Sequence, residues 1–491
     1  MTSARTLLNF SLILTVGAIA ASPAVAADGM LDQAFELTLT DLPDEAQAAI
    51  SAALQRGRMT VSNGRASDDL GCSVAMSADG DTVVVGAQDG SLYTPSSHEG
   101  VAYVFVKPGA GWSSTSAYAA ELADGVGTES GDLFGWSVSI SADGNTCVVG
   151  APFGGYVTNH GEAHVFVKPV GGWGSTGSPM YPTGTLTASN GAANDYFGDS
   201  VGISGDGNTV VVGAPGHDID ANADQGSAYL FYRGANWVDS TEDVSLTASD
   251  GAADDQFGGA VAINSVGGVA VVGASWDDIG VDADQGSVYV FAYSPPFWGQ
   301  FAKLTASDGS AFDELGNSVA IAGDGNTVVA GAHGSDIGLA SNVGAAYLFV
   351  APQFAWTDMN ETVRLGTFDW THDDAFGESV AISADGNTVV VGALYGGSVN
   401  QGAAYPYLKP GGGWTGTPIQ LSSLTASDGA ADDRFGNSVS ISSDGLTILV
   451  GSPGSDIGGN ADQGSAYVFD HRIFSDGFEA GDTSRWSSAV P

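Results

Sequence analysis

One pattern of about sixty residues recurs seven times along this chain, with the same marks in the same order. A Phe-Gly or Leu-Gly step identifies each copy, and its glycines are Gly71, Gly135, Gly198, Gly258, Gly316, Gly377 and Gly436. Their spacings of 64, 63, 60, 58, 61 and 59 residues are nearly constant. Units of this length that cannot bury a face alone predict a radial or stacked array of repeats, not unrelated domains.

Each copy predicts four short antiparallel strands. The first alternates small and β-branched residues, as in residues 318–321, and an Asp-Gly hairpin turn follows, as at Asp324-Gly325. The second is a β-branched run such as 388–393, and the third places Tyr289 and Phe291 two apart on one face. A loop with a tryptophan then leads to a short Leu-Thr-Ala-Ser strand. We interpret these tryptophans as packing residues: Trp112, Trp173, Trp237, Trp298, Trp356 and Trp414.

Seven copies of four strands predict an all-β, seven-bladed β-propeller of four-stranded antiparallel blades. Copy seven ends at Phe469 without its fourth strand, while residues 59–71 match residues 246–258 position for position. We therefore expect the N-terminal segment at Met59 to supply the missing strand and close the ring. The propeller would span 59–469, after an N-terminal appendage at 27–58 with a short helix from Pro43 to Arg56, and before a C-terminal tail at 470–491.

The charge balance restricts the partners. The chain has 13 basic and 56 acidic residues, a formal net charge of −43. Nucleic acids and anionic membranes are poor partners for this chain, because binding them requires clustered lysine and arginine. Cations, basic surfaces or a salty environment fit this charge, and so does the simpler interpretation that the acidity keeps an exported protein soluble.

The first 26 residues resemble a secretory signal peptide. Arg5 supplies the positive start, residues 7–20 are mostly apolar, and Ala24-Val25-Ala26 offers a cleavage site. No apolar run is long enough to predict a membrane span, so we expect a secreted, extracellular or cell-surface protein that is monomeric. The two cysteines, Cys72 and Cys147, fall at opposite ends of their hairpins, which predicts free thiols.

The repeat LTASDGAADDxFGxSVAIS…VVVGAP…GSAYVF resembles the FG-GAP repeat family over residues 59–469. Both ends of the family's name are present in two copies, as Phe134-Gly135 with Gly150-Ala151-Pro152 and as Phe197-Gly198 with Gly213-Ala214-Pro215. The family includes the propeller of integrin α chains, so the resemblance implies extracellular binding or adhesion. The integrin-type calcium loop is missing, because each hairpin holds only a tight turn, too short to wrap an ion.

Acidic residues follow strand four and strand two, and a meander places both of these loops on one face. The paired acids before Phe-Gly are interpreted as turn formers. The acids of the loops after strand two are either solvated turn residues or ligands for Ca²⁺, which prefers several oxygen ligands. The Ca²⁺ candidates are Asp218, Asp220, Asp224, Asp277, Asp278, Asp282, Asp284, Asp456 and Asp462.

No catalytic arrangement is visible. The seven histidines share no blade position and form no triad or metal-spaced trio: His98, His160, His164, His217, His333, His372 and His471. We predict a secreted, non-enzymatic binding or adhesion module that recognises an extracellular protein or glycan through its acidic loops, with Ca²⁺ as a possible aid. An exported hydrolase or lyase at the propeller mouth is the alternative, and a repeat scaffold in a larger adhesin-like surface is a third.

Overall fold

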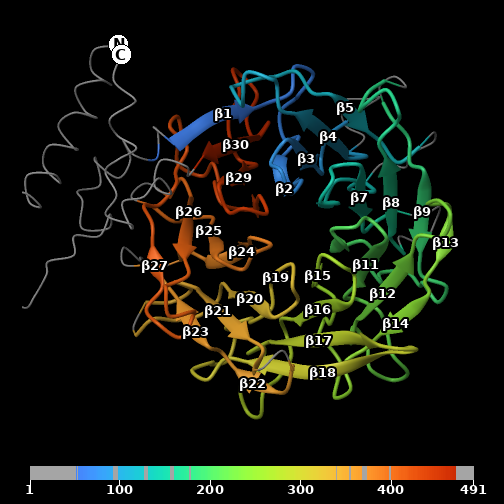
Figure 1. The fold of residues 1–491 in the computed structure, drawn as a ribbon, viewed down its shortest axis with the longest axis vertical. Coiled ribbons are helices and arrows are strands. Elements are labelled where there is room, and N and C mark those ends of the chain that lie inside the picture. The colour runs from blue at the N-terminus through green and yellow to red at the C-terminus, as the bar shows by residue number, and fades with distance from the viewer. Residues whose placement is uncertain are drawn as a thin grey trace, which may run out of the picture.

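The structure, a computed structural model, describes residue 51 and residues 54–91, 98–125, 131–154, 160–175, 179–338, 340–352, 355–367, 373–397 and 400–470. Seven small sheets stand around one central axis and close into a ring (Figure 1). The predicted seven-bladed propeller is therefore confirmed. The expected signal peptide and the C-terminal tail after Asp470 lie outside the described residues, as does most of the expected helix.

Each blade runs from an inner strand at the axis to an outer strand at the rim. Blades 1 to 4 are β2 (Leu70–Met76), β3 (Thr82–Ala87), β4 (Val101–Val106), β5 (Ala120–Leu122); β6 (Ser137–Ile140), β7 (Thr146–Ala151), β8 (Glu162–Val167), β9 (Gly184–Thr187); β10 (Val201–Ile203), β11 (Thr209–Ala214), β12 (Ser227–Tyr232), β14 (Val244–Leu246); β15 (Ala260–Ile263), β16 (Val269–Ala274), β17 (Ser287–Ser294), β18 (Phe297–Thr305).

Blades 5 to 7 are β19 (Val319–Ile321), β20 (Thr327–Ala332), β21 (Ala345–Val350), β23 (Val363–Leu365); β24 (Phe376–Ile382), β25 (Thr388–Ala393), β26 (Ala403–Leu408), β27 (Ile419–Gln420); β28 (Val439–Ile441), β29 (Thr447–Ser452), β30 (Ser465–Asp470), β1 (Gln55–Met59). Two short strands, β13 (Ser240–Thr241) and β22 (Met359–Asn360), pair in parallel with β9 and β18 of the preceding blade.

The Phe-Gly glycine fixes how each blade meets the one before it. All seven have positive φ, from 93° at Gly198 to 106° at Gly258, which favours glycine. A Cβ at Gly258 would collide with the carbonyl oxygen of Ser227 in the preceding blade. In six of the seven seams a serine hydroxyl of the preceding blade also donates to this glycine's carbonyl oxygen at 2.7–2.9 Å, from Ser73, Ser137, Ser200, Ser318, Ser379 and Ser438.

The apolar core lies between neighbouring blades. Between blades 3 and 4, for example, Leu230 of β12 packs in one cluster with Phe257, Tyr289 and Phe291 of blade 4. The ring of Phe257 lies 5.5 Å from that of Tyr289 and 5.8 Å from that of Phe291. Tyrosine and phenylalanine lie two apart on one face of strand three, as the sequence indicated, and in the structure they fill the seam.

Four tryptophans share one packing role. Their indole Nε1–H groups donate to the carbonyl oxygen of the hairpin glycine in the same blade, at 2.9–3.1 Å, from Trp112, Trp173, Trp356 and Trp414. Trp298 departs from this pattern because blade 4 has no tryptophan loop. There β17 and β18 form one long hairpin, and Trp298 lies within the outer strand and donates to the hydroxyl of Tyr232.

The N-terminal strand closes the ring as predicted. β1 pairs antiparallel with β30, and Met59 lies opposite Ala466, just as Leu246 lies opposite Ala228 in blade 3. The strand begins at Gln55, not at Met59, because pairing continues past a bulge at Gly57. The expectation of helix as far as Arg56 was therefore wrong at its C-terminal end.

The fourth strands are placed differently from the Leu-Thr-Ala-Ser prediction. In blades 1, 3 and 5 they end at the leucine of that motif, at Leu122, Leu246 and Leu365. The serine instead donates its backbone N–H to the next blade, as from Ser189 to Glu242. Both cysteines are free, as predicted. Among the residues that the structure describes, no helix is long and apolar enough to cross a membrane.

Candidate functional site

The loops that enter strand one and those that join strands two and three lie together, on what we call the loop face. Backbone hydrogen bonds connect them: Asp254 donates to Ala223 at 2.8 Å and Phe312 donates to Ala283 at 2.8 Å. The hairpin turns occupy the opposite side, which we call the hairpin face. The predicted concentration of acidic loops on one face is therefore confirmed by their contacts.

The aspartate three positions before the glycine of each Phe-Gly or Leu-Gly step is a buried turn former. The side chains at this position are only 2% to 7% exposed in all seven copies: Asp68, Asp132, Asp195, Asp255, Asp313, Asp374 and Asp433. Asp255, for example, accepts the backbone N–H of Ala252 at 2.6 Å. Burial raises the pKa of Asp68, Asp255 and Asp313 to about 6, although the backbone hydrogen bond opposes it. These carboxyls thus shape the loop, as the sequence indicated.

The acids after strand two build a second kind of turn. Asp218 accepts the backbone N–H of Asp224 at 3.0 Å, and the same bond joins Asp278 to Asp284 and Asp456 to Asp462. Within the first of these loops, Ile219 and Asn222 pair as a small antiparallel bridge. Asp218, Asp278 and Asp456 therefore hold their loops closed through their side chains.

The Ca²⁺ candidates lie in these loops but are divided among three blades. Burial and the carboxylates of Asp218 and Asp254 raise the pKa of Asp224; burial, Asp278, Glu314 and Asp254 do the same for Asp284. In the described ranges, no three His, Cys, Asp or Glu side chains meet in a group that could hold a metal ion. Asp277 differs from the other candidates because it is buried and bound to Lys303.

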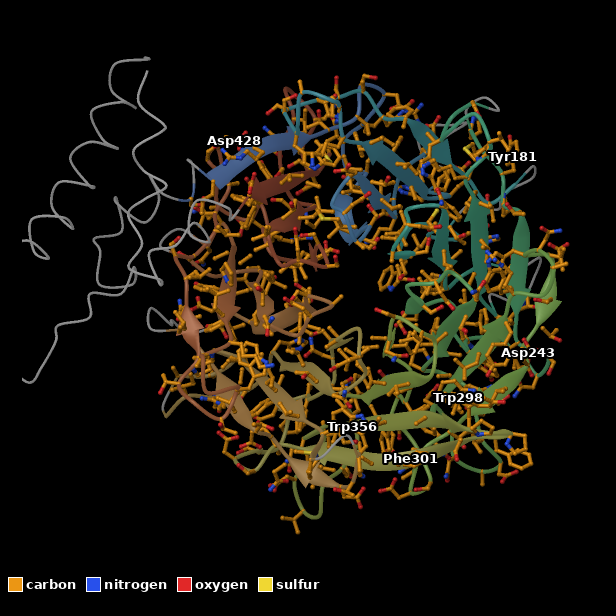
Figure 2. The ribbon with its side chains drawn as sticks, in the orientation of Figure 1. Tyr181, Asp243, Trp298, Phe301, Trp356 and Asp428 are labelled. Atoms are coloured by element: carbon orange, nitrogen blue, oxygen red, sulfur yellow. The ribbon has the colours of Figure 1, made fainter. Side chains whose placement is uncertain are left out.

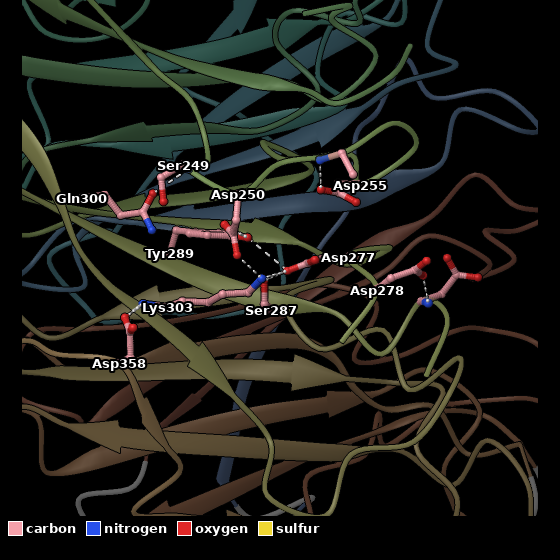
Figure 3. Close-up of polar contacts among 12 residues, drawn as sticks. Ser249, Asp250, Asp255, Asp277, Asp278, Ser287, Tyr289, Gln300, Lys303 and Asp358 are labelled. Carbon is pink, nitrogen blue, oxygen red and sulfur yellow. Dashed lines mark hydrogen bonds and ion pairs between the residues drawn. The ribbon is translucent and has the colours of Figure 1, made fainter. Parts of the chain in front are cut away.

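Blade 4 contains a polar cluster that the sequence analysis missed (Figure 3). Lys303 Nζ on β18 lies 2.7 Å from a carboxylate oxygen of both Asp250 and Asp277. The Tyr289 hydroxyl donates to Asp250 at 2.9 Å and also lies 3.1 Å from an oxygen of Asp277, to which Ser287 donates. Although burial opposes it, the two carboxylates raise the pKa of Lys303, which keeps its ammonium charged.

The same clamp of tyrosine, loop carboxylate and cation recurs in two further blades. Arg364 Nε lies 3.3 Å from Asp308, and its guanidinium carbon lies 5.9 Å from the ring centre of Tyr347. Arg58 occupies the same place over Tyr467, 5.7 Å from the ring centre. The signal lies in the sequence, since each tyrosine follows its aspartate by 39 positions. A basic residue directly before the Leu or Met of strand four completes it, as in Lys303-Leu304, Arg364-Leu365 and Arg58-Met59. Three of the few cations are thus neutralised on the acidic side.

The hairpin face uses its carboxylates differently. Asp143 accepts the Ser141 hydroxyl at 2.7 Å and the Asn145 N–H at 3.0 Å. Partial burial opposes ionisation of Asp143, but these hydrogen bonds outweigh burial, and the pKa of Asp143 is lowered below its usual value. Backbone bonds between neighbouring hairpins, such as Ala78 to Ala142 at 3.0 Å, tie the turns into a ring. These short turns contain the tight geometry that the sequence predicted in place of an integrin-type calcium loop.

The described histidines have separate surroundings. Burial lowers the pKa of His164 to about 4, so it is neutral at pH 7. His217 Nδ1 lies 2.8 Å from Asp195. His333 lies between Glu314, at 2.8 Å, and Glu378, at 3.0 Å; these carboxylates outweigh burial and raise its pKa to about 10. His372 and His471 lie outside the described residues.

The closed ring and its repeated seams define a seven-bladed propeller assembled from sequence repeats. The profile of the FG-GAP repeat matches this chain at residues 54–105, 124–166, 183–231, 240–291, 298–349, 359–407 and 419–469. The chain therefore belongs to the FG-GAP repeat family, as its resemblance indicated. Six of the seven matched segments join the outer strand of one blade to three strands of the next, so sequence repeats and blades are offset by one strand; the segment 124–166 begins just after the outer strand β5. A search of curated protein sequences gave no match.

Proposed function

We propose that the chain is an exported, non-enzymatic binding module that recognises a protein or glycan through its loop face. The observation that supports this most is the gathering of exposed carboxylates on that face, at Asp218, Asp220, Asp254, Asp278, Asp432 and Asp456. Clamps with aspartates neutralise the nearby cations Lys303, Arg364 and Arg58. A partner that presents cationic groups or hydroxyl donors complements such a surface.

Export is supported by the leader-like N-terminal sequence and by family membership, because FG-GAP repeats are typical of extracellular proteins. Exposed apolar side chains lie among the acids of the loop face, with Trp276 42% and Phe312 62% exposed. Aromatic rings with neighbouring carboxylates offer both contact area and hydrogen-bond acceptors, which suits recognition better than chemistry.

The test is a screen of glycan and extracellular-protein arrays with two matched triple variants. The loop-face variant carries Asp220→Asn, Asp254→Asn and Asp432→Asn, and the control carries Asp206→Asn, Asp324→Asn and Asp385→Asn on the hairpin face. All six are exposed, and each variant removes the same charge. We expect binding to fall at least about tenfold in the loop-face variant alone, because loss of complementary charge weakens association. Equal binding by all three proteins would contradict the proposal, and turnover of a bound ligand would favour an enzyme.

Ca²⁺ assistance is the second part of the proposal and has its own measurement. Ca²⁺ is titrated into EDTA-treated protein while the melting temperature is followed, since an ion that binds only the folded state raises it. Asp278→Asn and Asp456→Asn should reduce the shift if the loops after strand two hold the ion. A melting temperature unchanged at millimolar Ca²⁺ would exclude this part and leave the binding face untouched.

A further inference from the structure

The outer strand of blade 4 differs from the outer strands of the other blades. β18 has nine residues, whereas the others have between two and five. β17 and β18 pair continuously, from Val288 opposite Leu304 to Ser294 opposite Phe297, without an intervening loop. The additional length of the two strands forms an overhang. In Figure 1 the two strands run along the lower rim and their turn projects to the right. A two-stranded overhang of this kind gains little stability by itself.

Most of the outer edge of β18 has no strand beside it. β22 pairs with it only at Leu304 and Thr305. From Phe297 to Gln300, no other strand in the described part of the chain pairs with this edge. An edge with free N–H and C=O groups is a template for another strand, and proteins usually protect it by shortness, charge or proline.

Those protections are missing along this segment. No charged residue occurs from position 287 to 302, and the two prolines of the hairpin lie in its turn. Tyr293 is 47% exposed and Phe297 is 74% exposed. Trp298 lies at the outer rim in Figure 2, next to β14 and β18. The rim of blade 4 is thus a neutral, aromatic strand edge on a strongly acidic protein.

We propose that this edge pairs with the same edge of a second copy of the chain. Two chains of formal charge −43 repel one another, and a segment without charges is where they approach at the lowest electrostatic cost. Antiparallel pairing about a twofold axis uses one edge for both copies and leaves no open end. This assembly replaces the expectation of a monomer and does not depend on what the loop face binds.

The sequence of the edge is compatible with antiparallel pairing to its own copy. A bulge at Phe301 ends the regular strand, so pairing runs from Phe297 to Gln300. Facing residues of an antiparallel ladder have their side chains on the same side of the sheet, so a twofold pairing places Trp298 opposite Gln300 of the second copy and Gly299 opposite its own copy on the axis. The two blades would form one continuous sheet.

The experiment measures molar mass by analytical ultracentrifugation over about two decades of protein concentration, because association follows mass action. We expect the mass to rise toward twice the chain mass of 49.3 kDa. A variant with Phe297→Lys and Gln300→Lys should stay at the monomer mass, because lysine on an edge opposes strand pairing. The control carries Val170→Lys and Val266→Lys: both side chains are exposed and lie outside β17, β18 and the loop face, so this variant should keep the wild-type mass.

Amide hydrogen exchange separates strand pairing from other contacts. We expect the amides of 297–300 to become protected as the concentration rises, and those of β14 to stay unchanged. A wild-type chain that is monomeric throughout, including one that pairs this edge only with a foreign peptide, overturns the proposal. So does a dimer that survives the two lysines or leaves these amides unprotected. Unchanged melting temperatures of the variants confirm that they fold.

Discussion

Around the axis, the seam between neighbouring blades depends on close contacts of backbone atoms, whereas on the loop face the clamp within each blade depends on side chains. At the axis, Ser200 donates to the carbonyl of Gly258, and a Cβ on either Gly213 or Gly258 would collide with backbone. On the loop face, the clamp contains Arg58 and Asp428 in one blade but Glu121 and Asn63 in another. Where backbone packs on backbone, only glycine fits. Where side chains meet, a change in one residue can be compensated by a change in its partner.

The substitution Gly258→Ala tests the backbone seam most severely. It places a Cβ against the Ser227 carbonyl at a φ of 106°, so the backbone of one blade must shift. We expect a loss of about 3 kcal/mol or more in the free energy of unfolding, measured with denaturant. Gly259→Ala, one residue further, meets only the Gln256 oxygen at 3.5 Å and should change stability by less than about 1 kcal/mol. Similar losses for both would refute the distinction.

A pH series tests the loop face. The pKa of Asp68, Asp255 and Asp313 is raised from 3.8 to about 6, so the folded chain binds more protons than the unfolded chain between these values. Stability should therefore fall as pH rises from about 4 to 7, by on the order of 2 kcal/mol at fixed ionic strength. His164 acts in the opposite direction, because its pKa is lowered from 6.5 to about 4.

The control for the pH series is Asp255→Asn, which removes one of these titrating groups. Its unfolding free energy, measured at pH 5 and pH 7, should differ less between the two conditions than that of the wild type. A stability that rises across this range would show that the buried loop acids do not control the pH response.

The smallest effect concerns the one seam without a serine. Blade 4 has Ala260 where six other blades have serine, so the carbonyl of Gly316 lacks this donor. Ala260→Ser should add about 1 kcal/mol of stability, and Ser200→Ala in the neighbouring seam should remove a similar amount. Chemical denaturation of the two variants measures both signs. A destabilising Ala260→Ser would mean that the seam of blade 4 is packed differently.

The sequence predicted the parts of the fold that depend on backbone geometry. Hairpin turns were recognised because Gly144 and Gly325 need positive φ, and ring closure because Met59 occupies the register of Leu246. The long hairpin of blade 4 was missed because Trp298 matches the loop tryptophans in spacing. Only its neighbours, a Pro-Pro turn and an uncharged run, distinguish it.

The candidate site was predicted only in part. The sequence placed the acidic loops on one face, because a meander alternates its connections between two sides. It did not reveal that Asp277 is bound to Lys303, since that contact joins side chains from β18 and from the loop after β16. Nor did it show that Asp218 and Asp278 close their own loops by accepting a backbone N–H. Such roles depend on distances between side chains, which spacing alone does not give.

Closure of the ring by an N-terminal strand determines the order in which the blades can form during synthesis. Gln55 is among the first propeller residues to be synthesised, and its partner Phe469 is among the last. During synthesis β1 must wait unpaired until blade 7 is complete, because chains fold from the N-terminus as they emerge. The long separation makes this the costliest loop to close in chain entropy. The seam between β1 and β30 therefore forms last, and a chain shortened at its C-terminal end would keep an open ring.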